Sequence, residues 1–191
     1  MTDREKDPQN AAVEIGKTIA LSLILAFGIR SFIAEARFIP SESMLPTLEV
    51  HDRLIIEKVS YHLKKPERGD IIVFMPPEAA INCDPKQQLP LKDAYIKRVV
   101  GLPGEQVQVR NGRVYINDEL LEENYTYTEP DDRSSPLPPI AAIVPKKSYL
   151  VLGDNRNASC DSRIWGFVPE DNIIGRAVVR FWPFNRVNVG L

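Results

Sequence analysis

The sequence has few of the residues that usually bind metal ions: two histidines and two cysteines among 191 residues. His51 and His62 lie near each other, Cys83 and Cys160 lie far apart, and no Cys-x-x-Cys pair occurs. This pattern does not supply the four ligands of a structural zinc site. A disulfide between the cysteines requires an oxidising compartment, and two lone cysteines are more often unpaired, so the sequence leaves their state open.

A basic excess is also missing, because 24 lysines and arginines face 26 aspartates and glutamates. Proteins that bind nucleic acid neutralise its phosphates with clustered positive charge, so we expect no nucleic-acid partner. Aromatic residues make up only 8% of the chain, whereas 16 residues are proline. Proline interrupts helices but is tolerated in turns and at strand edges, so the composition favours a mainly β fold.

One apolar run stands near the N-terminus. Residues 18–29 carry no charge, and the run continues past Arg30 to Ala34. Seventeen residues are at the lower limit for crossing a bilayer, and Arg30 can extend its guanidinium to the headgroups. We therefore expect a short tail at 1–17, a transmembrane helix at 18–34 and a folded domain at 35–191.

Two other interpretations of this run remain open. A half-exposed core helix would have a polar face, but residues 19–29 are apolar on every side. A cleaved signal peptide would explain Lys17 and the tripeptide Ala34-Glu35-Ala36. However, the 17-residue segment before the run is longer than the short basic leader of a signal peptide and contains several acidic residues. A retained anchor is the favoured interpretation. Three basic residues before the run against two at or after its end say little about orientation.

Short runs of β-branched and apolar residues, bounded by turn formers, predict strands in the domain. Asn111-Gly112 joins 107–110 to 113–116 and predicts a hairpin with a type I′ turn. The proline-rich polar segment 129–139 predicts an irregular surface loop. The remaining predicted strands are 53–59, 70–75, 95–100, 148–152, 173–181 and 187–189.

Several segments combine turn formers with reactive side chains. They are 39–48 (IPSESMLPTL), 95–105 (YIKRVVGLPGE) and 153–163 (GDNRNASCDSR), supported by 68–74 (RGDIIVF) and Trp165-Gly166. In this order they resemble the signature motifs of bacterial type I signal peptidases, or leader peptidases, which are membrane-anchored serine proteases with a Ser-Lys dyad. The resemblance implies a β-rich catalytic domain with a small inserted β subdomain, here at about 106–150.

The chemistry of these residues agrees with a lysine base. A serine hydroxyl is a weak nucleophile that needs a base beside it, and neither histidine lies in a glycine-rich nucleophile motif. The pKa of a lysine is about 10.4, but desolvation can lower it to roughly 7–8. On a strand, Lys97 shares its face with Tyr95 and Val99, which can form an apolar wall around the amine. The alternative for a lysine on a half-exposed strand is an ordinary surface side chain.

The resemblance implies roles for six polar residues. Ser43 is the nucleophile, and Lys97 is the general base and later the general acid. The other four are Ser41, whose hydroxyl joins the Ser43 N–H in the oxyanion hole, Ser159, which orients the lysine, and Asp161 with Arg163, which form a structural ion pair. The alternative for Ser41 and Ser159 is that each builds a turn by bonding its own backbone. Asp154, Asn155 and Arg156 are expected to shape the loop.

The resemblance further implies cleavage of signal peptides after an Ala-x-Ala-like sequence, with no cofactor. The expected partners are preproteins and the lipid bilayer, with the N-terminus in the cytoplasm and the catalytic domain outside the cytoplasmic membrane. Two shallow pockets along an extended substrate would admit small side chains only. Their expected walls, which could instead be core residues, are Ile39, Pro40, Met44, Leu48, Tyr95 and Ile96.

Three residues depart from the usual motifs without removing a proposed catalytic group: Glu42, Glu105 and Cys160. Two rival functions are a self-cleaving Ser-Lys regulator and a non-catalytic, anchored β module that binds extended peptides. The first usually carries a DNA-binding domain where this chain has its apolar run. In the second the serines would only build turns.

Overall fold

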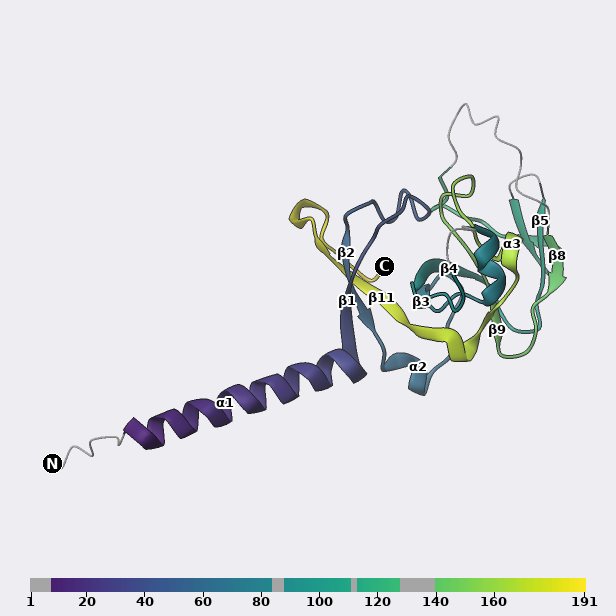
Figure 1. The fold of residues 1–191 in the computed structure, drawn as a ribbon. Helices are drawn as coiled ribbons and strands as arrows, with labels where there is room; N and C mark the ends of the chain where they lie inside the picture. The colour runs from purple at the N-terminus through teal and green to yellow at the C-terminus, as the bar shows by residue number, and fades with distance from the viewer. Residues whose placement is uncertain (1–7, 84–87, 111–112, 128–139) are drawn as a thin grey trace.

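The computed structural model describes residues 8–83, 88–110, 113–127 and 140–191. In this part of the chain, one long helix precedes two antiparallel sheets (Figure 1). The prediction of a mainly β fold behind an N-terminal apolar helix is therefore confirmed. The predicted loop 129–139 and the turn at 111–112 lie outside the described residues.

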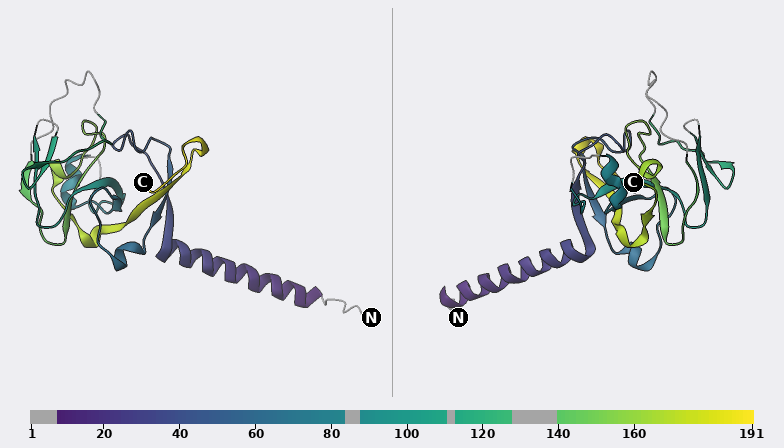
Figure 2. Two further views of the ribbon diagram at one scale, coloured as in Figure 1. Left: turned by 180° about the vertical axis from the view of Figure 1, so that it is seen from behind. Right: turned by 45° about the vertical axis from the view of Figure 1, so that its right-hand side comes forward.

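The long helix stands clear of the sheets in every view (Figure 2). It comprises α1 (Pro8–Gly28) and a π-helical turn, η1 (Ile29–Ile33). The stretch Ala11–Ile33 has a mean hydropathy of 1.8, which makes it long and apolar enough to cross a membrane, and none of its most apolar window is buried. The alternative of a core helix is therefore wrong. The helix begins ten residues before the predicted position 18, because 11–17 contains mainly good helix formers.

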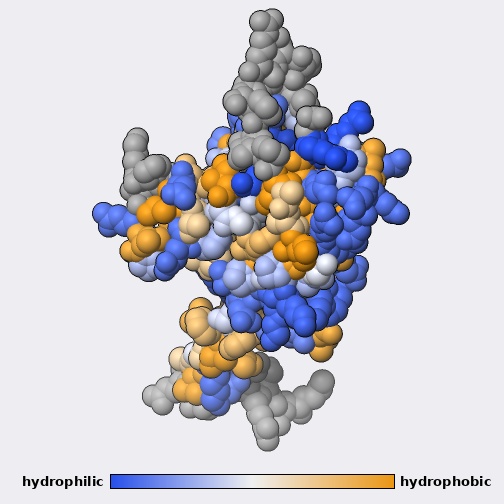
Figure 3. All heavy atoms as spheres, turned by 90° about the vertical axis from the view of Figure 1, so that its right-hand side faces the viewer, coloured by the Kyte–Doolittle hydropathy of each residue, from blue (hydrophilic) through white to orange (hydrophobic). Residues whose placement is uncertain are grey.

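The helix leads directly into β1 (Ala34–Phe38), the edge strand of the larger sheet. The tripeptide that resembles a cleavage site, Ala34-Glu35-Ala36, pairs in antiparallel register with β2 (Arg53–Glu57). Cleavage there would cut a paired strand, so the pairing favours a retained segment. In Figure 3 hydrophobic spheres gather on the helix below the domain, while hydrophilic spheres cover much of the domain face.

The larger sheet follows the order β1-β2-β11-β3-β4-β9-β10, with β12 paired to β11. All six runs predicted as strands outside the hairpin overlap strands of this sheet. Short helical segments connect some strands: α2 (Ser60–Leu63), η2 (Glu78–Cys83), α3 (Ser162–Trp165), η3 (Glu170–Asn172) and η4 (Phe184–Arg186). The strands not yet bounded are β3 (Ile71–Phe74), β4 (Tyr95–Gly101), β9 (Ser148–Leu152), β10 (Val168–Pro169), β11 (Ile173–Trp182) and β12 (Asn188–Val189).

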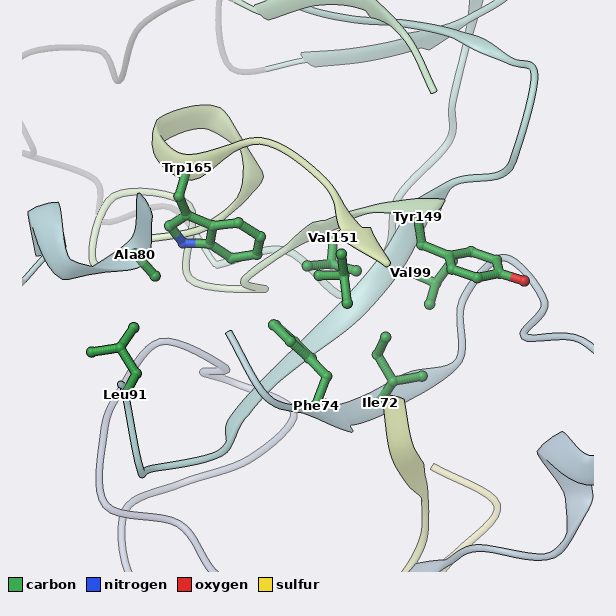
Figure 4. Packing of buried hydrophobic residues seen from close by; sticks show 9 residues of the cluster. Ile72, Phe74, Ala80, Leu91, Val99, Tyr149, Val151 and Trp165 are labelled. Carbon is green, nitrogen blue, oxygen red and sulfur yellow. The ribbon is translucent and has the colours of Figure 1, made fainter. Parts of the chain in front are cut away.

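The central strand β3 is buried on both faces, as its uninterrupted apolar sequence requires. Ile71 and Val73 point into one apolar cluster, whereas Ile72 and Phe74 point into another. Figure 4 shows the second cluster, where Phe74 lies near Trp165 of α3. The sheet therefore separates two cores, and the strands beside β3 are held rigidly between them.

The smaller sheet has the order β7-β6-β5-β8. The predicted hairpin is confirmed by the pairing of β5 with β6, in which Val109 faces Val114. Buried valines of this sheet pack against Leu150 and Leu152 of β9. The smaller sheet thus packs against β9, the strand that leads into the loop at 153–163. Its strands are β5 (Gln106–Arg110), β6 (Arg113–Ile116), β7 (Glu119–Leu120) and β8 (Ile140–Ile143).

Candidate active site

Ser43 lies in the turn that follows β1. Met44 and Leu48, next to it in this turn, are fully buried in the apolar core, and the Leu48 N–H donates to the carbonyl of Met44. The backbone N–H of Asn155 donates to the carbonyl oxygen of Ser43 at 3.1 Å. The serine is therefore held by the core on one side and by the loop at 153–163 on the other.

Lys97 lies on β4 and reaches this serine. Its Nζ is 2.7 Å from Ser43 Oγ and also donates to the carbonyl oxygen of Ile96 at 3.0 Å. Only 5% of Lys97 is exposed. Burial away from water lowers the pKa of its ammonium from 10.5 to about 8, against the opposing charges of Asp161 and Asp154. The two side chains form a buried hydroxyl–amine pair in which the amine loses its proton far more easily than a solvated lysine.

Ser41 lies beside the pair, at the open side. Its Oγ is 3.3 Å from Ser43 Oγ. The Ser41 hydroxyl and the Ser43 backbone N–H are thus both close to the point where a substrate carbonyl would be attacked. The structure brings together the three residues predicted for the nucleophile, the base and the oxyanion hole.

Gly153 begins the loop at 153–163, which passes against the backbone of Ser43. A Cβ on Gly153 would lie 2.2 Å from Ser159 Oγ and 2.5 Å from the carbonyl oxygen of Ser43. Only glycine permits this close approach. Ser159 Oγ is buried and, among the described residues, has no hydrogen-bond partner. Its orienting bond to Lys97 therefore stays a prediction, although the residue lies beside the site.

The predicted pair Asp161–Arg163 forms within this loop. Both guanidinium nitrogens involved, Nε and Nη2, lie 2.7 Å from a carboxylate oxygen of Asp161. Asp161 also accepts from the N–H of Gly153 at 3.0 Å. Because the carboxylate joins the two ends of the loop, the pair holds the loop in shape.

A second buried ion pair was not predicted. Arg98, the neighbour of Lys97, donates twice to Asp154, at 2.8 and 2.7 Å. The Thr47 hydroxyl donates to the same carboxylate at 2.5 Å. Asp154 is thereby tied to both motifs that carry the serine and the lysine, which agrees with the expected loop-shaping role. The signal for Arg98 was a second charge, next to Lys97, in a strand whose other residues carry no charge.

Cys83 and Cys160 form a disulfide, with their Cα atoms 6.0 Å apart. The statistical preference for unpaired cysteines was therefore misleading here. The bond joins η2 to the loop at 153–163, next to Ser159. A sequence separation of 77 residues offered no signal, because only the packing of η2 against α3 and its loop brings the two thiols together.

A pocket of about 510 Å³ opens over Ser43 and Lys97. Four of the six residues expected as walls line it: Ile39, Pro40, Tyr95 and Ile96. Met44 and Leu48 are not among the lining residues and are fully buried in the core behind the wall. This position agrees with the alternative given in the sequence analysis, in which the two side chains are apolar because they belong to the core. Further lining residues that the sequence did not indicate are Arg37, Phe38, Val73, Asp93, Ala94, Ala158 and Cys160.

Comparison with known proteins identifies the family of this chain. Residues 12–182 match the family model described as signal peptidase, peptidase S26. A signal peptidase I of Leptolyngbya laminosa is 64% identical over 90% of this chain and 80% of its own, and a probable signal peptidase I-2 of Synechocystis is 51% identical over 97% and 80%. A crystal structure of a signal peptidase I from Enterococcus faecalis aligns with a TM-score of 0.48 at 33% identity, over 59% of this chain and 97% of that one. The family match extends from the apolar helix to the end of β11, and the chain therefore belongs to the signal peptidase family, peptidase S26.

Proposed function

We propose that this chain is a membrane-anchored endopeptidase that removes signal peptides from exported preproteins by means of a Ser43–Lys97 dyad. The family supports signal-peptide cleavage by a serine peptidase. The single observation that supports the dyad is the 2.7 Å separation between Lys97 Nζ and Ser43 Oγ inside a buried site. A base must lie within hydrogen-bond reach of the proton that it removes.

In the proposed reaction, the neutral amine of Lys97 accepts the hydroxyl proton of Ser43 while Ser43 Oγ attacks the scissile carbonyl. A pKa of about 8 keeps a useful fraction of the amine neutral near pH 7, whereas an ordinary lysine would be almost wholly protonated. The developing oxyanion receives hydrogen bonds from the Ser43 N–H and the Ser41 hydroxyl. Each such donor is typically worth about 3 kcal/mol in the transition state.

Protonated Lys97 then donates its proton to the leaving amine, and the signal peptide remains bound as an ester of Ser43. Lys97 then removes a proton from water, which attacks the ester carbonyl. The bond between this carbon and Ser43 Oγ breaks, Lys97 returns the proton to Oγ, and the signal peptide leaves with a free carboxyl group. After each protonation an N–H of Lys97 needs an acceptor in the buried site. Ile96 O already accepts one. The buried hydroxyl of Ser159, which has no partner among the described residues, is proposed to accept another.

Substrate selection is proposed to occur in the apolar pocket. The edge strand β1 runs into Phe38, Ile39 and Pro40, while Tyr95 and Ile96 form the facing wall. An extended peptide between these walls would present alternate side chains to the enzyme. Walls of this kind favour the small residues of an Ala-x-Ala-like sequence, because larger side chains would collide with Ile39 or Ile96.

The apolar helix is proposed to anchor the enzyme in the bacterial cytoplasmic membrane, with the N-terminus in the cytoplasm and the catalytic domain outside. The exposed helix supports the first part of this proposal. A disulfide beside the site supports the second, since disulfides persist in oxidising compartments outside the cytoplasm. A topology reporter fused after Leu191 would test the orientation, and a cytoplasmic signal from it would contradict the proposal.

The test of the catalytic proposal uses the full chain in detergent with a purified preprotein. Ser43→Ala and Lys97→Ala are each expected to reduce the rate of processing by about 10²- to 10⁴-fold or more. Lys146→Ala, which removes an exposed lysine, serves as the matched control and should process at the wild-type rate. Mass spectrometry of the product identifies the cleaved bond. Undiminished processing by either dyad variant would refute the assignment.

A further inference from the structure

The segment at 121–127, here called the strap, leaves the smaller sheet and crosses to the loop at 153–163. Its first residue, Leu121, packs against the core of the smaller sheet, and its N–H donates to the carbonyl of Val114 at 2.9 Å. Its last residue, Tyr127, donates its N–H to the carbonyl of Asp154 at 2.9 Å and forms a parallel bridge with Asn155. The strap therefore connects the inserted sheet to the loop that holds the backbone of Ser43.

Glu123, in the middle of the strap, forms a two-point ion pair with Arg156 of the loop. The side chains of Glu123 and Arg156 are only 7% and 6% exposed. Arg156 Nε donates to the carbonyl of Gly153 at 3.0 Å, and Arg163 donates to the carbonyl of Arg156 at 2.8 Å. A buried charge requires its partner, so the position of Arg156 depends on Glu123. Gly153, which Arg156 holds, is the residue that passes between Ser43 and Ser159.

Tyr125 provides a second connection, on the other side of the site. Its ring stacks on the guanidinium of Arg98 with 4.1 Å between the guanidinium carbon and the ring centre. Its hydroxyl donates to Glu123 at 2.7 Å, which links the two contacts of the strap. Arg98 is the neighbour of Lys97 on β4 and the ion-pair partner of Asp154. A ring over a guanidinium contributes both a cation–π attraction and a cover against water.

We propose that Glu123 and Tyr125 are positioning residues for the Ser43–Lys97 pair, acting through Arg156 and Arg98. This inference rests on the proposed function and extends it to the inserted sheet. The strap does not line the pocket over Ser43, so it acts on the geometry of the reacting pair rather than on substrate contacts. Misplacement of reacting groups by about 1 Å can cost roughly 10²-fold in rate.

The experiment measures kcat and KM for preprotein processing by the full chain in detergent, together with the melting temperature of each variant. Glu123→Gln and Tyr125→Leu are expected to lower kcat by roughly 10- to 100-fold while KM changes by less than about twofold. Glu123→Asp and Tyr125→Phe keep the charge and the ring, respectively, and should recover most of the lost rate. These milder variants also keep the proposal testable if Glu123→Gln or Tyr125→Leu unfolds.

Two matched controls separate positioning from general damage to the inserted sheet. Glu122→Gln changes the exposed neighbour of Glu123, and Tyr115→Leu removes a comparable ring from Arg110 in the smaller sheet, where the stacking distance is 4.2 Å. Both should keep the wild-type kcat. Equal losses in the controls and in the strap variants would overturn the proposal, because they would indicate damage to the sheet as a whole.

The two proposals fail in different ways. Folded Glu123→Gln and Tyr125→Leu with wild-type kcat, beside an inactive Ser43→Ala, would refute the positioning role alone. Undiminished processing by Ser43→Ala would refute the proposed dyad and the positioning role with it. A rise in KM with unchanged kcat would also overturn the inference, since it would place the strap in substrate binding.

Discussion

The N-terminal helix and the surroundings of Lys97 depart from ordinary globular structure in opposite directions. The helix exposes large apolar side chains, including Leu23 and Phe27, whereas the site buries charged ones, including Lys97, Arg98 and Asp154. An exposed apolar helix is stable in hydrocarbon, and a buried charge is stable beside an opposite charge. Each region therefore needs a particular environment. For the helix this is hydrocarbon outside the molecule, and for the site it is the opposite charges that the fold places nearby.

The two regions also differ in how strongly a single substitution should destabilise them. The apolar helix acts through the sum of many equivalent side chains, so loss of one methylene matters little. The buried charges act in specific pairs, in which the loss of one member leaves the other without compensation. The following predictions test this difference, beginning with the largest expected effect.

Removing one member of the buried pair Arg98–Asp154 should be the most damaging change. Arg98→Met is expected to lower the free energy of unfolding by about 3–5 kcal/mol, because Asp154 stays buried without its cation. Chemical denaturation of the full chain in detergent measures this loss. The double variant Arg98→Met/Asp154→Leu should recover a large part of it. A double variant as unstable as the sum of the two single ones would contradict the explanation.

A single charge in the helix should weaken membrane integration. Lysine at the centre of a spanning helix costs about 2.5–3.5 kcal/mol, so Leu23→Lys should reduce the fraction of the protein that resists alkaline extraction from membranes. Leu23→Ala, the matched control, should remain integrated. The melting temperature of the detergent-solubilised domain should not change in either variant. Full integration of Leu23→Lys would argue against a spanning role for this helix.

The depressed pKa of Lys97 predicts how activity and stability change with pH. In the proposed mechanism the neutral amine is the base, so kcat/KM should rise about tenfold between pH 7 and pH 9 for a pKa of about 8. Between about 8 and the ordinary value of 10.5 the unfolded chain holds a proton that the folded chain has released. The free energy of unfolding should therefore rise with pH in this window, by at most about 1.4 kcal/mol per pH unit.

Lys97→Met provides the reference for the pH measurement. The difference in unfolding free energy between wild type and this variant isolates the titration of Lys97 from that of other groups. The difference should change between pH 8 and 10.5 and should be constant at lower pH. A difference that is flat across the whole range would show that the lysine has an ordinary pKa.

The smallest effect is expected for an exposed ion pair, which sharpens the contrast with Arg98–Asp154. Arg186 lies 2.5 Å from Glu49, whose side chain is 54% exposed. Glu49→Gln should change the free energy of unfolding by less than about 1 kcal/mol, since solvent screens the pair. Arg186 keeps its second partner, Asp52, at 3.1 Å. A loss comparable to that of Arg98→Met would remove the distinction between exposed and buried pairs.

Most strands were predictable because their sequences carry local signals. The short apolar and β-branched run at 53–59 indicated β2, and Asn111-Gly112 between two further runs of this kind indicated the hairpin. Strand β8 carried no such signal, since Ile140–Ile143 is short and follows a polar segment. The helix extends beyond the start of the predicted transmembrane segment, because a search for uncharged residues overlooks helix formers that flank them.

Site residues could be named where a single motif contains them, whereas contacts between two distant segments could not be predicted. Ser43 and Lys97 could be named from their own motifs. The disulfide, the pair Arg98–Asp154 and the contact of Glu123 with Arg156 each join segments that are far apart in the chain. The sequence left pocket and core both open for Met44 and Leu48, because apolar residues beside a nucleophile have the same sequence pattern whether they face substrate or core.

The sequence by itself determined that an apolar helix precedes a β-rich domain, because hydrophobic periodicity is a local property. Its motifs also indicated Ser43 and Lys97 as the proposed reactive groups, through their resemblance to those of the signal peptidases. Only the tertiary structure decided that the amine lies 2.7 Å from the hydroxyl and that its pKa falls to about 8. Burial depends on the atoms that surround a group in space. Those atoms come from β4, the turn after β1 and the loop at 153–163, which are adjacent only in the folded chain.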